Sequence, residues 1–206
     1  HGETIILDSQ SGVLIVGADN YVIDIYREKQ KKEIRNKKKL EELKNVKCET
    51  KDGIEITLMA NIEQPDEAQK AKENGALGIG LLRSEFLFLN KTKMPSEEEQ
   101  FLAYKNAILT MKGFPVSIRT LDYGADKLIP FINNKFEKEL NPALGQRAIR
   151  FCLDNEELFL TQIRAILRAS FFGDTKILLP LITNHHEIIK TREIINIAIS
   201  QLRSKN

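Results

Sequence analysis

The feature that most constrains the fold is a repeated alternation of short apolar segments with helical segments after Gly53. The apolar segments are predicted strands, at residues 54–62, 78–82, 115–121 and 175–182. The remaining segments include predicted helices, at residues 64–73, from Ser96 onward, 142–153, 155–170 and 185–203. Ser96 with Glu99 forms the capping-box signature of a helix start. Strands that are apolar on both faces and are each followed by a helix predict a parallel sheet covered by helices.

The four predicted strand–helix units amount to half of an eightfold βα barrel. A complete barrel of this kind usually needs about 250 residues, whereas the chain has 206 and its last predicted helix runs almost to Asn206. We therefore expect an α/β fold, a partial (β/α)8 TIM barrel containing about the first four βα units. On this interpretation the sequence is a piece of a longer one.

A different pattern precedes the barrel-like region. Residues 4–16 contain two apolar runs around a polar loop with Gly12, which predicts a β-hairpin. A lone hairpin is not stable in water, so we expect it to belong to a larger sheet. Residues 20–45 lack Pro and Gly and carry apolar residues at roughly helical spacing, which predicts a long helix.

The predicted long helix is strongly basic. Residues 27–47 hold ten Lys or Arg against four Glu. We interpret this run as the solvated face of a linker helix. A nucleic-acid patch is the alternative, but Tyr26 is the one aromatic residue beside it and Gly-rich loops are missing from the sequence around it.

Composition excludes several classes of protein. The formal charge of +2 gives no reason to expect a nucleic-acid partner. No apolar run approaches the roughly 20 residues of a membrane span, so membrane insertion is not expected. Cys48 and Cys152 stand far apart in a sequence without a secretory signal, which favours a reducing compartment over a disulfide framework. We expect a cytoplasmic protein.

Two of the predicted strands lead directly into arginines, Arg83 and Arg119, and Arg147 is expected just inside a later helix. Functional residues of a βα barrel lie where strands end. Arginine is costly to place at the mouth of an apolar sheet unless an anion compensates it, and its planar fork matches phosphate and carboxylate oxygens in pairs. The arrangement predicts a small ligand with more than one negative group. The alternative is structural, with each arginine paired to a neighbour such as Glu85 or Asp122.

Five segments occur in the order of the signature blocks of a known family. They are GIGLLRSEFLFLN (78–90), PSEEEQFLAYK (95–105), RTLDYGADK (119–127), NPALGQRAIRFCLD (141–154) and TQIRAILRAS (161–170). The chain resembles the PEP-utilising enzymes, in particular the phosphoenolpyruvate-protein phosphotransferases (Enzyme I), whose relatives include pyruvate phosphate dikinase and phosphoenolpyruvate synthase. The resemblance implies that residues 1–19 end the swivelling phosphohistidine domain, residues 20–50 form the linker helix, and residues 51–206 form the N-terminal half of the PEP-binding TIM barrel.

The resemblance also implies an activity. The family moves the phosphoryl group of phosphoenolpyruvate, with Mg²⁺, to an enzyme histidine and then to the carrier protein HPr during sugar uptake. By motif, Arg83 and Arg119 match the arginines that grip the phosphoryl group, and Arg147 is a further member of the anion pocket. Asp122 and Lys127 match the pocket rim, with Asp122 positioning Arg119. The resemblance further implies a homodimer of the full-length enzyme.

Several parts of the family's machinery find no match in this sequence. The acceptor histidine, the Mg²⁺ ligands and the proton-donating cysteine are all expected outside it, so we assign no catalytic and no metal-binding residue to the chain. His185 and His186 are expected to face solvent or cap a helix, and Cys48 and Cys152 to have no catalytic role. The chain alone is therefore expected to be inactive.

Two residues depart from the family's pattern. Ser84 stands where threonine is usual, which keeps the hydroxyl, and Ala125 replaces a glycine, which requires a negative φ at that turn. Three alternatives to the sugar-system enzyme stay open: a truncated regulatory or binding module, a paralogue from the nitrogen branch of the system, and a barrel whose missing half is a separate chain.

Overall fold

The computed structural model describes residues 2–89, 91–124, 141 and 144–204. The chain divides into two compact units, His1–Lys47 and Cys48–Asn206. In the described part of both units, no helix is long and apolar enough to cross a membrane.

The first unit contains the predicted hairpin and long helix, which are confirmed. Strands β1 (Ile5–Asp8) and β2 (Val13–Val16) pair antiparallel, and helix α1 (Asn20–Glu42) follows, with a 3-10 turn at Leu43–Asn45. Asp19 caps the helix by accepting a hydrogen bond from the backbone N–H of Val22. None of the residues of α1 is buried, as expected for a solvated helix.

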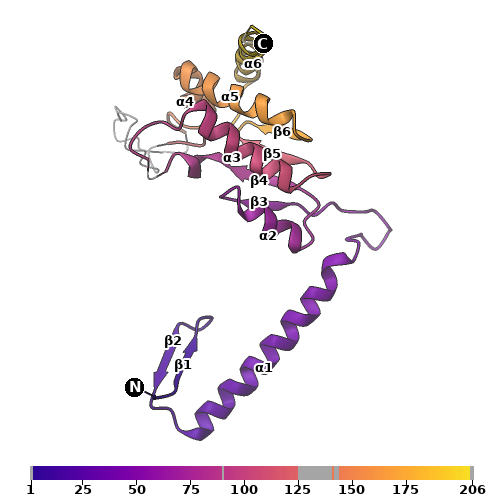
Figure 1. Cartoon of the computed structure of the whole chain (residues 1–206), viewed down its shortest axis with the longest axis vertical. Helices are drawn as coiled ribbons and strands as arrows, with labels where there is room; N and C mark the ends of the chain where they lie inside the picture. The colour runs from indigo at the N-terminus through magenta and orange to yellow at the C-terminus, as the bar shows by residue number, and fades with distance from the viewer. Residues whose placement is uncertain (1, 90, 125–140, 142–143, 205–206) are drawn as a thin grey trace. The chain divides into compact units, whose positions relative to one another are not determined.

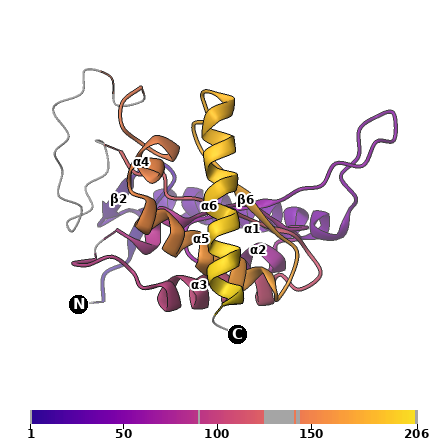
Figure 2. The ribbon, with the colours of Figure 1, turned by 90° about the horizontal axis from the view of Figure 1, so that it is seen from above.

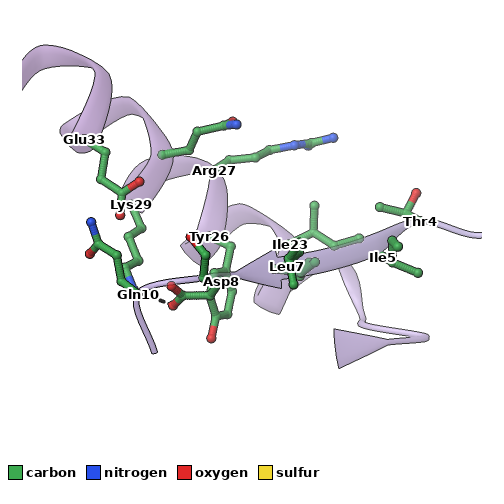
Figure 3. A pocket seen from close by; sticks show the side chains of 13 residues that line it. Thr4, Ile5, Leu7, Asp8, Gln10, Ile23, Tyr26, Arg27, Lys29 and Glu33 are labelled. Atoms are coloured by element: carbon green, nitrogen blue, oxygen red, sulfur yellow. Dashed lines mark hydrogen bonds and ion pairs between the residues drawn. The ribbon is translucent and has the colours of Figure 1, made fainter. Parts of the chain in front are cut away.

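A polar contact joins the hairpin to α1 (Figure 3). Lys29 of α1 donates a hydrogen bond to the carboxylate of Asp8, the last residue of β1. Asp8 also accepts from the backbone N–H of Ser11 in the hairpin loop. The Lys29 hydrogen bond, with the help of Ser11, lowers the pKa of Asp8 to about 2. The carboxylate is therefore ionised at neutral pH and fixes the hairpin loop against the helix.

The second unit is built on a parallel sheet (Figure 1). Its four strands are hydrogen-bonded in the order β3 (Ala60–Ile62), β4 (Ile79–Arg83), β5 (Val116–Arg119) and β6 (Thr175–Leu178). The predicted mixed α/β fold with a parallel sheet is thus confirmed. The carboxyl ends of all four strands lie at one edge of the sheet, which brings the segments that follow them together.

Helices accompany these strands along the chain. They are α2 (Glu67–Glu73), α3 (Glu97–Thr110), α4 (Ile149–Asp154), α5 (Glu156–Ser170) and α6 (His185–Arg203), with a 3-10 turn at Ser84–Leu87. The predicted capping box of Ser96 and Glu99 is present at α3, and Asn184 with Glu187 forms a second one at α6. Helix α5 packs against both α3 and α6, and Figure 2 shows α6 crossing in front of α5.

Two clusters of buried apolar side chains hold the unit together. The first joins the sheet to α3 and α5 through residues such as Ile79, Val116 and Ile108. The second lies beyond the carboxyl end of β5, where Leu121 and Tyr123 pack with α4, α5 and α6. The segment that follows β5 at the carboxyl edge of the sheet is therefore packed into an apolar core.

Gly78 directly precedes β4, at a place where an added side chain would clash with the main chain. Its φ is +151°, and an added Cβ would lie 2.8 Å from the carbonyl oxygen of Pro115. Gly78→Ala should lower the free energy of unfolding by about 1–3 kcal/mol, because it combines backbone strain with a clash against the main chain. Urea unfolding of the chain measures this.

The matched control is Gly113→Ala, because Gly113 has a φ of +94° but nothing within 4 Å of an added Cβ. This variant should lose about 1 kcal/mol, from the left-handed backbone alone. Equal losses in the two variants would mean that the Pro115 contact is of no consequence.

Three of the predicted strands are shorter than expected. The strand predicted at 54–62 is limited to Ala60–Ile62, because the backbone before it turns back on itself: the N–H of Ile56 donates to the carbonyl of Cys48 instead of to a sheet neighbour. The strands predicted at 115–121 and 175–182 end at Arg119 and Leu178.

The helix predicted at 142–153 begins only at Ile149. Residues 142 and 143 lie outside the described part of the chain. Ala148 has a φ of +51°, which no α-helical residue adopts, so the helix cannot extend further upstream. The helix predicted at 64–73 likewise starts later, at Glu67, whose carboxylate accepts hydrogen bonds from the backbone N–H groups of Glu63 and Gln64.

Candidate functional site

Two arginines stand side by side at the carboxyl ends of neighbouring strands. Arg83 is the last residue of β4, Arg119 is the last residue of β5, and the two are direct partners in the parallel register. Adjacent strands lie about 4.8 Å apart. The sheet therefore places two guanidinium-bearing residues close together at the edge where βα folds bind ligands.

Each of these arginines contacts at least one carboxylate. Nη1 of Arg83 lies 2.8 Å from Oε1 of Glu63, which follows the neighbouring strand β3. Nη2 of Arg119 contacts Glu85 and lies 3.4 Å from Oδ2 of Asp122. The ion pairs that the structural alternative foresaw, with Glu85 and Asp122, are thus present for Arg119.

Arg147 joins the same cluster through Asp122. Its Nη2 lies 3.1 Å from Oδ1 of Asp122, while the other carboxylate oxygen faces Arg119. Asp122 thus lies between two guanidinium groups. Arg147 was expected just inside a helix, but it precedes α4, which begins at Ile149. The backbone N–H of Ala148, the next residue, donates to the carbonyl of Tyr123 at 2.8 Å and ties this segment to the one after Asp122.

The structure therefore brings together four of the five residues expected to bind substrate. Arg119, Asp122 and Arg147 form one connected group, and Arg83 is the register neighbour of Arg119. Lys127 lies outside the described residues, and so does Ala125 with its turn.

The guanidinium of Arg119 has donor capacity left over. The side chain is 17% exposed, and its buried Nε has no hydrogen-bond acceptor among the described residues. Arginine carries five N–H donors in a fixed fork, so one engaged nitrogen leaves others available. A buried donor without an acceptor is costly. Such a donor at a strand end is suited to an anionic ligand.

A buried polar network lies behind the arginines. Gln162 of α5 contacts Leu121 and Ser84, which follow β5 and β4, and Tyr104 of α3. Ser84 stands where the family usually has threonine, and its hydroxyl accepts a hydrogen bond from Gln162. Burial raises the pKa of Tyr104, which keeps its phenol protonated. Gln162 was not among the residues expected at the site, although it lies in one of the five signature segments.

The histidines of α6 and the two cysteines, which were expected to have no catalytic role, differ in their surroundings. His185 and His186 are the first residues of α6 and are exposed, with Asn184 as the helix cap. Cys48 is exposed, and Cys152 is buried. Burial, with a smaller effect of the nearby Asp122 charge, raises the pKa of the Cys152 thiol well above its usual range. A neutral, buried thiol is a poor nucleophile.

Metal ligands are not gathered in the part of the chain that the structure describes. It contains no group of three His, Cys, Asp or Glu side chains placed to hold a metal ion. The described carboxylates of the cluster, Glu63, Glu85 and Asp122, each contact an arginine instead. These residues therefore do not form a Mg²⁺ site by themselves.

Comparison with known proteins gives one consistent family. The family described as "PEP-utilising enzyme, PEP-binding domain" matches residues 37–206. The phosphoenolpyruvate-protein phosphotransferase of Cupriavidus necator is 46% identical over 199 residues, which are 96% of this chain and 34% of that protein. The proteins of the same name from Staphylococcus carnosus and Bacillus subtilis are each 40% identical, over 99% and 95% of this chain. The chain spans about a third of the length of these relatives.

Proposed function

The chain belongs to the PEP-utilising enzyme family, and from this premise we propose that it supplies the phosphate-binding part of a phosphoenolpyruvate-protein phosphotransferase. The observation that carries the proposal is the register pairing of Arg83 with Arg119 at the carboxyl ends of β4 and β5. Phosphoenolpyruvate bears a phosphoryl group and a carboxylate. Both match the planar fork of arginine, which stays charged at any working pH.

Each residue of the cluster has a role in this proposal. Arg83 and Arg119 bind the phosphoryl group, and the unused Nε donor of Arg119 supports this role. Asp122 holds Arg119 and Arg147 in place through its two oxygens. Arg147 adds a third positive charge to the anion pocket. Lys127 is assigned to the pocket rim from its motif alone.

The proposed reaction is a phosphoryl transfer. The bond between phosphorus and the enol oxygen breaks, a bond between phosphorus and a histidine nitrogen forms, and the enolate of pyruvate leaves. The arginines neutralise the charge on the phosphoryl oxygens while the group moves, which is the main protein contribution to such reactions. The described residues do not fit Mg²⁺ alone, so its ligands are assigned to no residue of this chain and no step is derived through the metal.

The same proposal covers the architecture. The four-stranded parallel sheet supports a partial (β/α)8 barrel formed by residues 51–206. The boundary between the compact units, after Lys47, supports a separate hairpin and linker helix at residues 1–19 and 20–50. HPr as phosphate acceptor, a role in sugar uptake, a homodimer and a cytoplasmic location complete the proposal, and these rest on the relatives.

The direct test follows the phosphate. The complete gene product, incubated with phosphoenolpyruvate labelled in its phosphoryl group and Mg²⁺, should acquire acid-labile label on a histidine and pass it to HPr. The 206-residue chain alone should stay unlabelled, because the resemblance to the family assigns the acceptor histidine to another segment and to neither histidine of α6. Stable labelling of the chain alone would contradict the assignment of the acceptor to another segment.

Glu63 offers a test of the site that does not depend on turnover. Its carboxylate contacts Arg83 and should repel an incoming anion, so Glu63→Gln is expected to tighten phosphoenolpyruvate binding by roughly two- to fivefold. Calorimetric titration measures the affinity. Both side chains are well exposed, so the free energy of unfolding should change by less than about 1 kcal/mol.

The control for Glu63→Gln is Glu98→Gln, which removes a carboxylate that contacts Arg168 on the helices and none of the strand-end arginines. This variant should bind phosphoenolpyruvate like the wild type. Weaker binding by Glu63→Gln would show that Glu63 supports Arg83 in the bound state and does not compete with the ligand.

A further inference from the structure

One buried side chain connects the segments that follow both arginine-bearing strands. Gln162 of α5 is fully buried. Its Oε1 accepts a hydrogen bond from the backbone N–H of Leu121 at 2.9 Å. Its Nε2 donates to the hydroxyl of Ser84 at 3.0 Å and to that of Tyr104 at 3.1 Å.

The orientation of this amide is fixed by its partners. The N–H of Leu121 can only donate, so the carbonyl oxygen of Gln162 must face it. Both hydrogens of Nε2 are then directed to hydroxyl oxygens, and the Tyr104 hydroxyl uses its own hydrogen on Gln100. The amide satisfies one donor and two acceptors at once, and buried networks of this kind are rigid when every member is satisfied.

The contacts fall where the sheet ends. Ser84 directly follows Arg83, and Leu121 lies between Arg119 and Asp122. The backbone N–H of Thr120 still bonds to β6, through the carbonyl of Leu178, whereas that of Leu121 bonds to Gln162. At Leu121, one residue before Asp122, the backbone N–H is thus bonded to Gln162 and no longer to a strand of the sheet. The same amide also hydrogen-bonds Ser84, the first residue after Arg83.

We propose that Gln162 is a positioning residue for the anion site of Arg83 and Arg119. It fixes the distance between the two strand ends, so that both guanidinium groups meet the same phosphoryl group. Gln162 touches no substrate in this role and acts through Ser84 and Leu121. The inference rests on the function proposed for the arginines.

The chain offers a matched control in the same network. Gln100 of α3 is also fully buried. Its Nε2 donates to the carbonyl of Pro95 at 3.0 Å, and its Oε1 accepts from the Tyr104 hydroxyl at 3.3 Å. These contacts lie at the start of α3 and involve neither strand end. Loss of this amide removes two buried hydrogen bonds, against three for Gln162, and does not free the segments after Arg83 and Arg119.

The experiment compares Gln162→Met with Gln100→Met in the complete gene product, because methionine keeps the length of the side chain and removes the amide. Steady-state kinetics with phosphoenolpyruvate and thermal unfolding are measured for both. Both variants should have a lower Tm. Gln162→Met should in addition lose roughly ten- to a hundredfold in kcat/KM, since small misplacements of binding groups have effects of this size.

Most of the loss in Gln162→Met should lie in KM, because the arginines bind the phosphoryl group before transfer as well as during it. Gln100→Met should keep kcat/KM within about threefold of the wild type. Equal kinetics in the two variants would overturn the proposal and leave Gln162 a purely structural residue. A wild-type protein that does not consume phosphoenolpyruvate would instead refute the proposed function.

A milder substitution keeps the proposal testable if Gln162→Met does not fold. Ser84→Ala removes one hydroxyl that accepts from Gln162 and leaves the Leu121 contact intact. It should raise KM for phosphoenolpyruvate by about threefold. It should lower Tm by less than Gln162→Met does, because it leaves one buried N–H without its acceptor whereas Gln162→Met removes three hydrogen bonds. An unchanged KM in this variant would contradict the proposed route from Gln162 to Arg83.

Discussion

Replacement of Arg119 by alanine in the complete gene product is expected to lower kcat/KM for phosphoenolpyruvate by roughly a thousandfold or more. Arg119 is largely buried and contacts both Glu85 and Asp122. The variant would lose the guanidinium that we propose binds the phosphoryl oxygens, while two carboxylates stay beside the site. The remaining negative charge would then repel the substrate as well as fail to neutralise it. Steady-state kinetics over a range of phosphoenolpyruvate concentrations measures the effect.

Two further variants serve as comparisons for Arg119→Ala. Arg119→Lys keeps the positive charge but loses the planar fork, so it should recover only part of the activity. Arg168→Ala removes an arginine that contacts Glu97 and Glu98 on the helices, and it should leave kcat/KM within about twofold. A nearly normal rate in Arg119→Ala would remove this residue from the site.

The sequence was sufficient to predict the placement of the arginines because the prediction needed only two regularities. Apolar strands separated by helices imply a parallel sheet, and in a parallel sheet all strands end at the same edge. Arg83 and Arg119 could therefore be expected close together before their register was known. Asp122 was expected beside Arg119, and the observed contact at 3.4 Å agrees with that arrangement.

The contacts across the sheet could not be predicted in the same way. Glu63 directly follows β3, the strand beside that of Arg83, but which strands are neighbours and in what register depends on the assembled sheet. Gln162 lies 78 positions from Ser84 in the sequence, and nothing in its own helix indicates that its amide points to the strand ends. Long-range polar partners of this kind leave no local pattern.

The wrong boundaries have a similar origin. The alternation at 54–59 is typical of a strand, yet the backbone of Ile54 and Ile56 bonds locally to Thr50 and Cys48 instead of to a strand of the sheet. Helix α4 was expected to start before Ile149, because nothing in the residue type of Ala148 signals a positive φ. Backbone hydrogen bonds decide both cases: a local one from Ile56 to Cys48 in the first, and a longer-range one from the Ala148 N–H to Tyr123 in the second.

The second large expected effect concerns stability. Arg164 of α5 links three helices: its Nε lies 2.7 Å from Glu97 of α3, its Nη1 lies 2.7 Å from the Gln201 side chain of α6, and its Nη2 bonds to Thr161 of its own helix. Arg164 is 9% exposed. Arg164→Met should lower the free energy of unfolding by about 3 kcal/mol, because it leaves partly buried polar groups without this partner.

Arg168→Met is the matched control, because Arg168 also contacts Glu97 but its side chain is 30% exposed. It should lose only about 1 kcal/mol. Urea unfolding of the chain measures both variants. Equal losses would mean that the helix-linking contacts of Arg164 add nothing to those of a surface ion pair.

The pH dependence gives the same prediction an independent check. Burial alone would raise the pKa of Glu97, but the hydrogen bonds from Arg164 and Arg168 outweigh it and lower the pKa from its ordinary value of 4.5. A carboxyl group whose pKa is lowered on folding stabilises the protein above the unfolded pKa, and this stability is lost as the pH falls through the folded pKa. The difference in unfolding free energy between wild type and Arg164→Met should therefore narrow as the pH is lowered from 7 to below about 4. A difference that stays constant over this range would mean that the Arg164 contacts stabilise the fold independently of the charge on Glu97.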